Sequence, residues 1–193
     1  MKIFKQHPLN FRAGAIYDPK IEARRMEIIS RFMGCYGLPV LDVGEKNGFG
    51  AALASEAIGD GYPINTSGDL DAFWIPSAPK LRTYPTVWIF EVIEHLMNPL
   101  LFMLRLRNYC DNRTRIFITY PRHSVSLFWA PNHFHEMDKF RFRHLVESAG
   151  YEIVKHKKKI LYRKWSSYFK GLRPLCRLFL FPNHHNYYEL RMK

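Results

Sequence analysis

The stretch Val40-Leu41-Asp42-Val43-Gly44 decides the fold expected for this chain. It is a short apolar run that ends in glycine, which is typical of a strand buried on both faces of a parallel sheet. Gly48 and Gly50 follow closely, and glycine permits positive φ and a close approach of a ligand to the backbone. Residues 51–58 are good helix formers. The segment therefore predicts a strand, a glycine-rich turn and a helix.

Predicted strands and helices alternate on both sides of this unit. Asp18-Pro19 and Asn98-Pro99 each place proline behind a helix-capping residue, and Asp138 is a third cap. Further strands are predicted at residues 62–66, 86–90, 115–120, 151–159 and 187–193. The alternation predicts an α/β, Rossmann-like fold with a mainly parallel sheet and helices on both faces. The last two strands are expected to form an antiparallel ribbon at one edge.

The size and composition of the chain predict a single cytoplasmic domain. At 193 residues the chain has the size of one domain, so we expect residues 1–193 to form one unit. Its three cysteines are scattered and lack the spacing of a metal site, which favours a reducing compartment. The sequence begins without a secretory pattern and contains no run of about 18 apolar residues that would span a bilayer.

The positive charge is concentrated in the C-terminal part of the chain. Residues 139–193 hold 14 Lys/Arg against three acidic residues, whereas the rest of the chain is nearly balanced. Within this part, residues 163–181 form a basic, amphipathic insertion that fits packing on the protein's own sheet, an acceptor-docking lid or an anionic membrane surface. The last alternative would place the protein peripherally at the inner membrane surface. Nucleic acid is a less favoured partner, because no RNA-binding motif accompanies the charge.

Acidic residues follow the predicted strands where open α/β sheets bind ligands, outside the carboxyl ends of the strands. Gly68-Asp69-Leu70-Asp71 is one such segment, and Phe90-Glu91-Val92-Ile93-Glu94-His95-Leu96 is another. Carboxylates at these places can accept hydrogen bonds from ribose hydroxyls. Asp69 and Asp71 also fit ordinary turn chemistry, and ordinary polarity at a helix entry is the favoured interpretation of Glu94 and His95.

Three motifs occur in a recognisable order: the strand and glycine turn at 40–44, Glu91-Val92-Ile93-Glu94-His95-Leu96 before Asn98-Pro99, and His133-Phe134-His135-Glu136 before a helix ending at Ala149-Gly150. Together they resemble the class I S-adenosylmethionine-dependent methyltransferases, especially the small bacterial type-11 and type-23 groups. The resemblance covers roughly residues 35–160. It implies methyl transfer with S-adenosylmethionine as cofactor.

The resemblance also implies roles for individual residues. The glycine turn would hold the amino-acid part of the cofactor, an acidic residue would hold its ribose and adenine, and the end of the 86–90 strand would lie beside it. The cofactor-binding residues implied in this way are Asp42, Gly44, Gly48, Asp69 or Asp71, Phe90 and Glu91. The loop that carries His133 and His135 would face the acceptor.

Two departures from the family pattern leave a non-catalytic binding or scaffold protein as an alternative. Lys46 stands where the family usually has glycine, and the segment from Gly50 to Val87 is short for the family. An RNA methyltransferase is a second alternative, suggested by the basic C-terminal part. The favoured hypothesis is methyl transfer to a small-molecule acceptor or to one linked to lipid or glycan.

The histidines of the 133–136 segment supply the candidate catalytic group. His133 and His135 are predicted as general bases, because an unperturbed histidine pKa of about 6.5 lies near working pH. The same segment is open to a metal-site interpretation through His133, His135 and Glu136. No fourth ligand is evident and the His-Glu-x-x-His helix motif is absent, so the sequence assigns no metal site.

Overall fold

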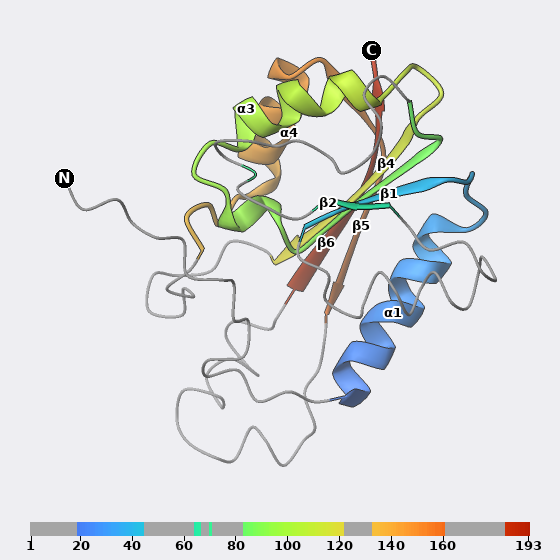
Figure 1. Cartoon of the computed structure of the whole chain (residues 1–193). Helices are drawn as coiled ribbons and strands as arrows, with labels where there is room; N and C mark the ends of the chain where they lie inside the picture. Colours follow the sequence, from blue (N-terminus) through green and yellow to red (C-terminus); the bar gives the residue numbers. More distant parts are fainter. Residues whose placement is uncertain (1–18, 45–63, 67–69, 71–82, 122–132, 161–183) are drawn as a thin grey trace.

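The computed structural model describes residues 19–44, 64–66, 70, 83–121, 133–160 and 184–193 (Figure 1). These residues form one six-stranded sheet in the order β2-β1-β3-β4-β6-β5. Four neighbouring strands run parallel: β2 (Ile64–Thr66), β1 (Val40–Val43), β3 (Thr86–Phe90) and β4 (Arg115–Pro121). The predicted mainly parallel sheet is confirmed.

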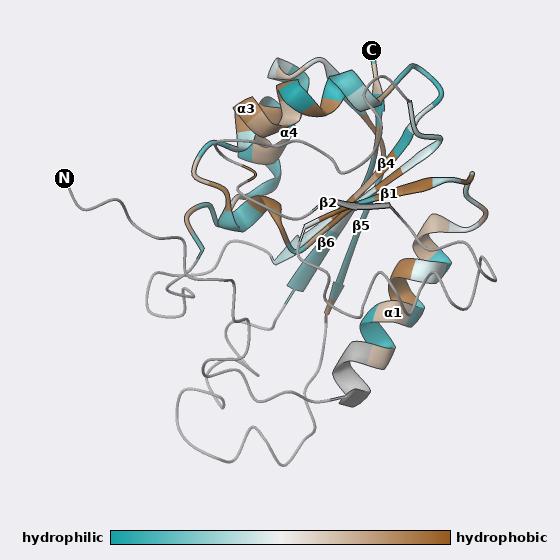
Figure 2. Ribbon diagram, viewed as in Figure 1, coloured by the Kyte–Doolittle hydropathy of each residue, from teal (hydrophilic) through white to brown (hydrophobic). Residues whose placement is uncertain are grey.

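The two C-terminal strands form the predicted antiparallel ribbon. β6 (His184–Met192) pairs antiparallel with both β4 and β5 (Tyr151–Ile160). The last strand of the chain therefore lies inside the sheet, between β4 and β5, and it begins three residues earlier than predicted. Because β5 forms the edge of the described sheet, its residues from Val154 to Lys159 are exposed. Figure 2 shows the corresponding change from apolar β1 to hydrophilic β5.

The three described α-helices begin at the residues predicted from the sequence. They are α1 (Pro19–Met33), α3 (Pro99–Leu106) and α4 (Lys139–Ser148), with the short 3₁₀ helices η1 (Ile93–His95) and η2 (Arg107–Tyr109). The Asn98 side chain accepts a hydrogen bond from the Leu101 N–H (3.0 Å), and Asp138 caps α4 in the same way. None of these helices is both long and apolar enough to cross a bilayer. The predicted helix at 51–58 and the insertion at 163–181 lie outside the described residues.

Alternate residues of the central strands β1, β3 and β4 face opposite sides of the sheet and contribute to two apolar cores. On one face, Val87 and Ile89 of β3 pack beneath α3 and α4. On the other face, Trp88 and Phe90 pack against α1. Because both faces are covered, every residue of β3 is buried, which explains its continuous apolar sequence.

Arg115 fastens the end of α1 to the sheet. Its Nε lies 2.7 Å from Oε1 of the buried Glu189 on β6. Its Nη2 donates to the Met33 carbonyl (3.1 Å), and its Nη1 donates to the carbonyl of Cys35. These carbonyls lie at and just beyond the C-terminus of α1, where backbone acceptors lack intrahelical partners. Arg115 thus fixes α1 relative to the strands that carry the candidate site.

Candidate functional site

Gly44, the first residue after β1, lies against the segment that follows β3. The two strands are parallel neighbours, with Val43 paired to Ile89, so both chains leave the sheet at the same edge. Gly44 has φ +127°, a conformation that L side chains rarely adopt. A Cβ at Gly44 would lie 2.7 Å from Cγ2 of Val92, closer than atoms can pack. The backbone geometry and the close contact both require glycine here.

Of the other residues predicted to bind the cofactor, only Asp42, Phe90 and Glu91 are among the described residues. Asp42 is half-buried on β1. The Phe90 side chain is only 5% exposed and stacks on Trp88, with ring centroids 5.7 Å apart, so it is a packing residue and its backbone is what reaches the strand end. Gly48, Asp69 and Asp71 lie outside the described residues, as does Lys46. Leu70, between the two aspartates, is buried in the core on the α3–α4 face.

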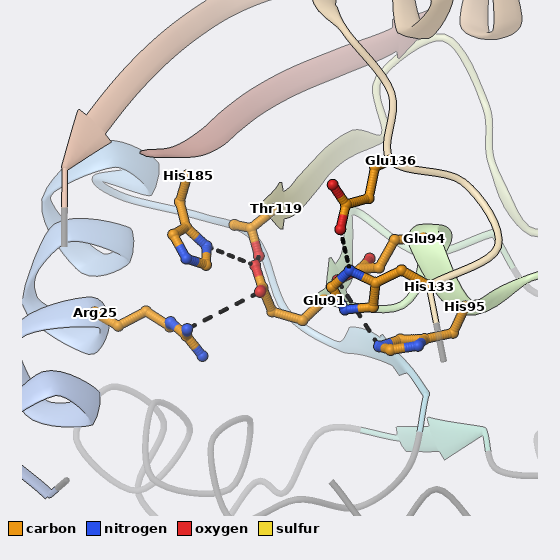
Figure 3. Close-up of polar contacts among 8 residues, drawn as sticks. All are labelled: Arg25, Glu91, Glu94, His95, Thr119, His133, Glu136 and His185. Carbon is orange, nitrogen blue, oxygen red and sulfur yellow. Dashed lines mark hydrogen bonds and ion pairs between the residues drawn. The ribbon is translucent and has the colours of Figure 1, made fainter. Parts of the chain in front are cut away.

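Glu91 lies at the centre of a half-buried ionic network, with its side chain 17% exposed (Figure 3). Its Oε1 accepts a hydrogen bond from the Thr119 hydroxyl (3.0 Å) and lies 3.2 Å from Nδ1 of His185. Its Oε2 lies 4.0 Å from Nη2 of Arg25. Burial would raise the pKa of this carboxyl, but the charges of His185 and Arg25, with the hydrogen bonds from His185 and Thr119, lower it well below its usual range. The ionised carboxylate therefore joins β3 to α1, β4 and β6.

The sequence reasoning found Glu91 but missed its partners. Arg25 belongs to α1, and His185 is 94 residues away on β6. No spacing rule connects such positions, because only the sheet order brings them together. The backbone of Glu91 has φ +56°, and its N–H donates to the Thr119 carbonyl (2.9 Å). Its carboxylate is committed to α1 and β6, so we interpret it as a residue that positions the strand end.

Glu94 and His95, which follow Glu91 in the same sequence motif, are buried. The 3₁₀ helix η1 buries Glu94 (1% exposed) and His95 (8% exposed). Nε2 of His95 lies 3.9 Å from Oε1 of Glu94, and the rings of His95 and His133 meet edge to face with centroids 4.8 Å apart. Polarity at a helix entry would leave Glu94 and His95 in solvent, so that interpretation is wrong. Their neighbour across the cluster, His133, is partly exposed and lies 3.2 Å from Glu136 through its Nδ1.

Glu94 is the most unusual group in this cluster. Neither of its carboxylate oxygens has a hydrogen-bond partner among the described residues. Burial raises the pKa of this carboxyl well above its usual range, and the negative charge of Glu91 raises it further. The backbone carbonyl of Glu94 accepts hydrogen bonds from the N–H groups of Phe134 (2.9 Å) and His135 (3.1 Å). The loop that carries the predicted histidines is thereby held against η1.

The structure separates the two predicted catalytic histidines. His133 faces the cluster of Glu94 and His95, whereas Nε2 of His135 lies 3.2 Å from the Met97 carbonyl. His135 also lines an open groove of about 370 Å³ between the start of α3 and α4, to which Arg141 and His144 contribute positive or titratable groups. His133 therefore belongs to the buried cluster, and His135 belongs to the open groove.

Comparison with known proteins gives similarity in structure alone. No family model and no curated protein sequence matches the chain. It is similar to an S-adenosylmethionine-dependent methyltransferase from Archaeoglobus fulgidus (16% identity, TM-score 0.59, 91% of this chain and 94% of that chain). It is also similar to 1,6-didemethyltoxoflavin-N1-methyltransferase from Burkholderia thailandensis, solved with S-adenosylhomocysteine (11% identity, TM-score 0.56, 91% of this chain and 80% of that chain). A third similar structure is the [4+2]-cyclase SpnF (12% identity, TM-score 0.57, 88% of this chain and 80% of that chain).

These structural similarities establish the fold, which is that of the class I S-adenosylmethionine-dependent methyltransferases. The fold expected from the resemblance is thus confirmed, while no match assigns the chain to the type-11 or type-23 group. The similarity to a cyclase illustrates that one fold can support a different reaction. The function must therefore be argued from the site itself.

Proposed function

We propose that this protein is an S-adenosylmethionine-dependent methyltransferase acting on a small-molecule acceptor or on one linked to lipid or glycan. The observation that carries the proposal is the glycine turn at Gly44, packed on Val92 at the carboxyl ends of two adjacent parallel strands. Ligands of open α/β sheets bind at this edge. The methyltransferases of similar structure, one of them solved with S-adenosylhomocysteine, support the same cofactor here.

The residues present fit this cofactor. The Gly44 turn offers backbone without a side chain, and the backbone of Phe90 lies at the neighbouring strand end. We propose that these groups and Asp42 hold the amino-acid part, with Gly48 completing the turn and Asp69 or Asp71 holding the ribose. Glu91 would act through its network by fixing the strand end. When bound, the cofactor supplies an electrophilic methyl group on sulfur.

The chain's own contribution to the reaction is alignment and proton removal. Holding an acceptor in line with the methyl group can lower the barrier by about 7–11 kcal/mol. We assign the base to His135, because it lines the open groove whereas His133 faces a buried cluster. If the Nε2–H of His135 donates to the Met97 carbonyl, Nδ1 keeps its lone pair and can take a proton from an acceptor oxygen or nitrogen.

The first test is cofactor binding. Isothermal titration of the full chain with S-adenosylmethionine and S-adenosylhomocysteine is expected to show one site for each. Gly44→Ala is expected to abolish binding, because its Cβ enters the turn and meets Val92. Gly34→Ala is the matched control: Gly34 also has positive φ (+63°) but lies at the end of α1. Absence of binding in the natural chain would overturn the proposal.

The second test is methyl transfer. Cofactor carrying a labelled methyl group, incubated with fractionated small molecules, lipids and glycans, is expected to label one fraction. His135→Ala should lower the transfer rate by roughly 10²–10⁴-fold while leaving cofactor affinity unchanged, as expected for a general base. An equal loss of cofactor affinity would instead assign His135 to binding.

RNA is a second candidate acceptor, favoured by the exposed lysines of β5, which include Lys157 and Lys159. Charged residues on an edge strand also prevent pairing with other chains, so the lysines have a structural explanation as well. Binding to random RNA that weakens steeply with salt would support an RNA acceptor, and salt-independent weak binding would exclude it. The proposed membrane contact through residues 163–181 lies outside the described residues and stays a prediction, testable with anionic vesicles.

A further inference from the structure

We propose that Glu94, His95 and His133 bind a divalent transition-metal ion, and that Zn²⁺ fits them best. One potential ligand atom from each of the three lies within 4.8 Å of the other two. Two imidazoles and one carboxylate form the donor set of one class of catalytic zinc site, in which a fourth position stays open. Ca²⁺ and Mg²⁺ prefer sets made of oxygen alone, so the two nitrogen donors select against them.

Glu94 provides an independent argument for a ligand. Its side chain is 1% exposed, and neither carboxylate oxygen has a hydrogen-bond partner among the described residues. Buried polar groups almost always have partners, because leaving one unpaired costs free energy. Oε1 of Glu94 points toward Nε2 of His95, 3.9 Å away, rather than toward a donor on another element. A cation between the carboxylate and the imidazoles would supply the missing partner.

The surroundings of His133 resemble those of a metal-binding histidine. Its Nδ1 lies 3.2 Å from Oε1 of Glu136. Histidines that bind metals commonly give their second ring nitrogen to a carboxylate, which fixes the ring and its tautomer. This contact leaves Nε2 of His133 for the ion. Figure 3 shows the Glu136–His133 pair turned toward Glu94 and His95.

The backbone holds the ligands together before any ion binds. The carbonyl of Glu94 accepts hydrogen bonds from the N–H groups of Phe134 and His135, the two residues that follow His133. The loop with one ligand is therefore tied to the 3₁₀ helix with the other two. A tetrahedral ion with bonds of about 2.0–2.1 Å keeps its ligand atoms about 3.4 Å apart. Side-chain movements of roughly 1 Å would close the three donors onto it.

The position of the site gives the ion a role in the proposed reaction. Val92, which packs on Gly44, immediately precedes η1, so two of the proposed ligands, Glu94 and His95, follow this contact by two and three residues. The open fourth position is available to an acceptor oxygen or nitrogen, whose pKa a bound ion lowers. This role rests on the proposed methyltransferase function, whereas the binding of the metal does not.

The test is metal binding by the full chain, produced without a polyhistidine tag. Elemental analysis and calorimetry with ZnCl₂ are expected to give about one ion per chain, and Co²⁺ should show the visible absorption of a four-coordinate site. Glu94→Gln and His133→Ala should each weaken Zn²⁺ binding at least about 100-fold, and Glu136→Gln about 10–100-fold. The matched control is His135→Ala, two residues from His133, which should bind Zn²⁺ as the natural chain does.

Two outcomes would overturn the proposal. One is the absence of both a stoichiometric ion and the Co²⁺ absorption, which would mean that Glu94 is a buried, protonated acid. The other is unchanged Zn²⁺ affinity in a folded His133→Ala variant; because His133 is partly exposed, this variant is informative even if Glu94→Gln does not fold. Titration of the same samples with S-adenosylhomocysteine separates the two hypotheses. If the chain binds S-adenosylhomocysteine but not Zn²⁺, the metal site is refuted and the proposed methyltransferase function stands. If it binds Zn²⁺ but not S-adenosylhomocysteine, the metal site stands and the proposed function is refuted.

Discussion

Replacing Gly44 by alanine tests the contact on which the candidate site depends. The alanine would have φ +127°, and its Cβ would lie 2.7 Å from Cγ2 of Val92. A non-glycine residue in such a conformation costs about 1–3 kcal/mol, and overpacking costs about another 1–3 kcal/mol. Gly44→Ala should therefore lower the free energy of unfolding by roughly 2–6 kcal/mol, a large part of the 5–15 kcal/mol typical of native proteins.

Two further variants separate the strain from the overlap. In Gly34→Ala the new residue would have φ +63° and meet no described atom within 4 Å, so it should lose only about 1–2 kcal/mol. Val92→Ala removes the Cγ2 atom that the Gly44→Ala methyl would strike. The double variant at positions 44 and 92 should therefore be about 1–3 kcal/mol more stable than the sum of the two single changes predicts.

Urea denaturation followed by tryptophan fluorescence measures these differences, since Trp88 is fully buried beside the site. A Gly44→Ala variant as stable as Gly34→Ala would refute the predicted overlap, and so would strict additivity in the double variant. Repeating the series with S-adenosylhomocysteine links stability to function. At 100 times its dissociation constant, the ligand should stabilise the natural chain by about 2.7 kcal/mol and leave Gly44→Ala unaffected.

Three more predictions concern the network around the site. Folding lowers the pKa of Glu91, so the ionised carboxylate stabilises the folded chain above its ordinary pKa of about 4.3, and this stabilisation is lost as the pH falls toward the lowered pKa. Glu91→Gln should therefore lower the free energy of unfolding by on the order of 3 kcal/mol at pH 7, and urea denaturation should show the difference between variant and natural chain shrinking below about pH 4. Arg115→Ala leaves the buried Glu189 unpaired and should cost about 3–5 kcal/mol in the same assay, with a smaller loss when Glu189→Gln is added; equal losses would contradict the ion-pair explanation. Tyr151→Phe removes a buried hydrogen bond of 3.0 Å to the Met103 carbonyl and should cost about 1 kcal/mol by thermal unfolding, and an unchanged midpoint would show that this bond contributes nothing net.

Local patterns determined most of the fold. The continuous apolar sequence of β3 marked a strand covered on both faces, and the caps at Asn98 and Asp138 placed the starts of α3 and α4 to the residue. These features act over a few neighbouring residues, so they can be read from the sequence. The position of β6 was different, because whether the last strand lies at the edge or between β4 and β5 depends on pairing between distant segments.

The candidate site likewise has features set by local sequence and features set by tertiary structure. The sequence by itself determined that a glycine turn follows β1 and that the Glu91–His95 motif follows β3, since both are local consequences of strand ends. Only the tertiary structure decided that Glu91 meets Arg25 and His185, and that His133 joins Glu94 and His95 while His135 does not. These partners come from separate elements, and their distances depend on sheet order and loop docking. Burial then turned Glu94 from an ordinary polar residue into a candidate ligand, because the cost of an unpaired carboxylate arises only when the folded chain excludes water.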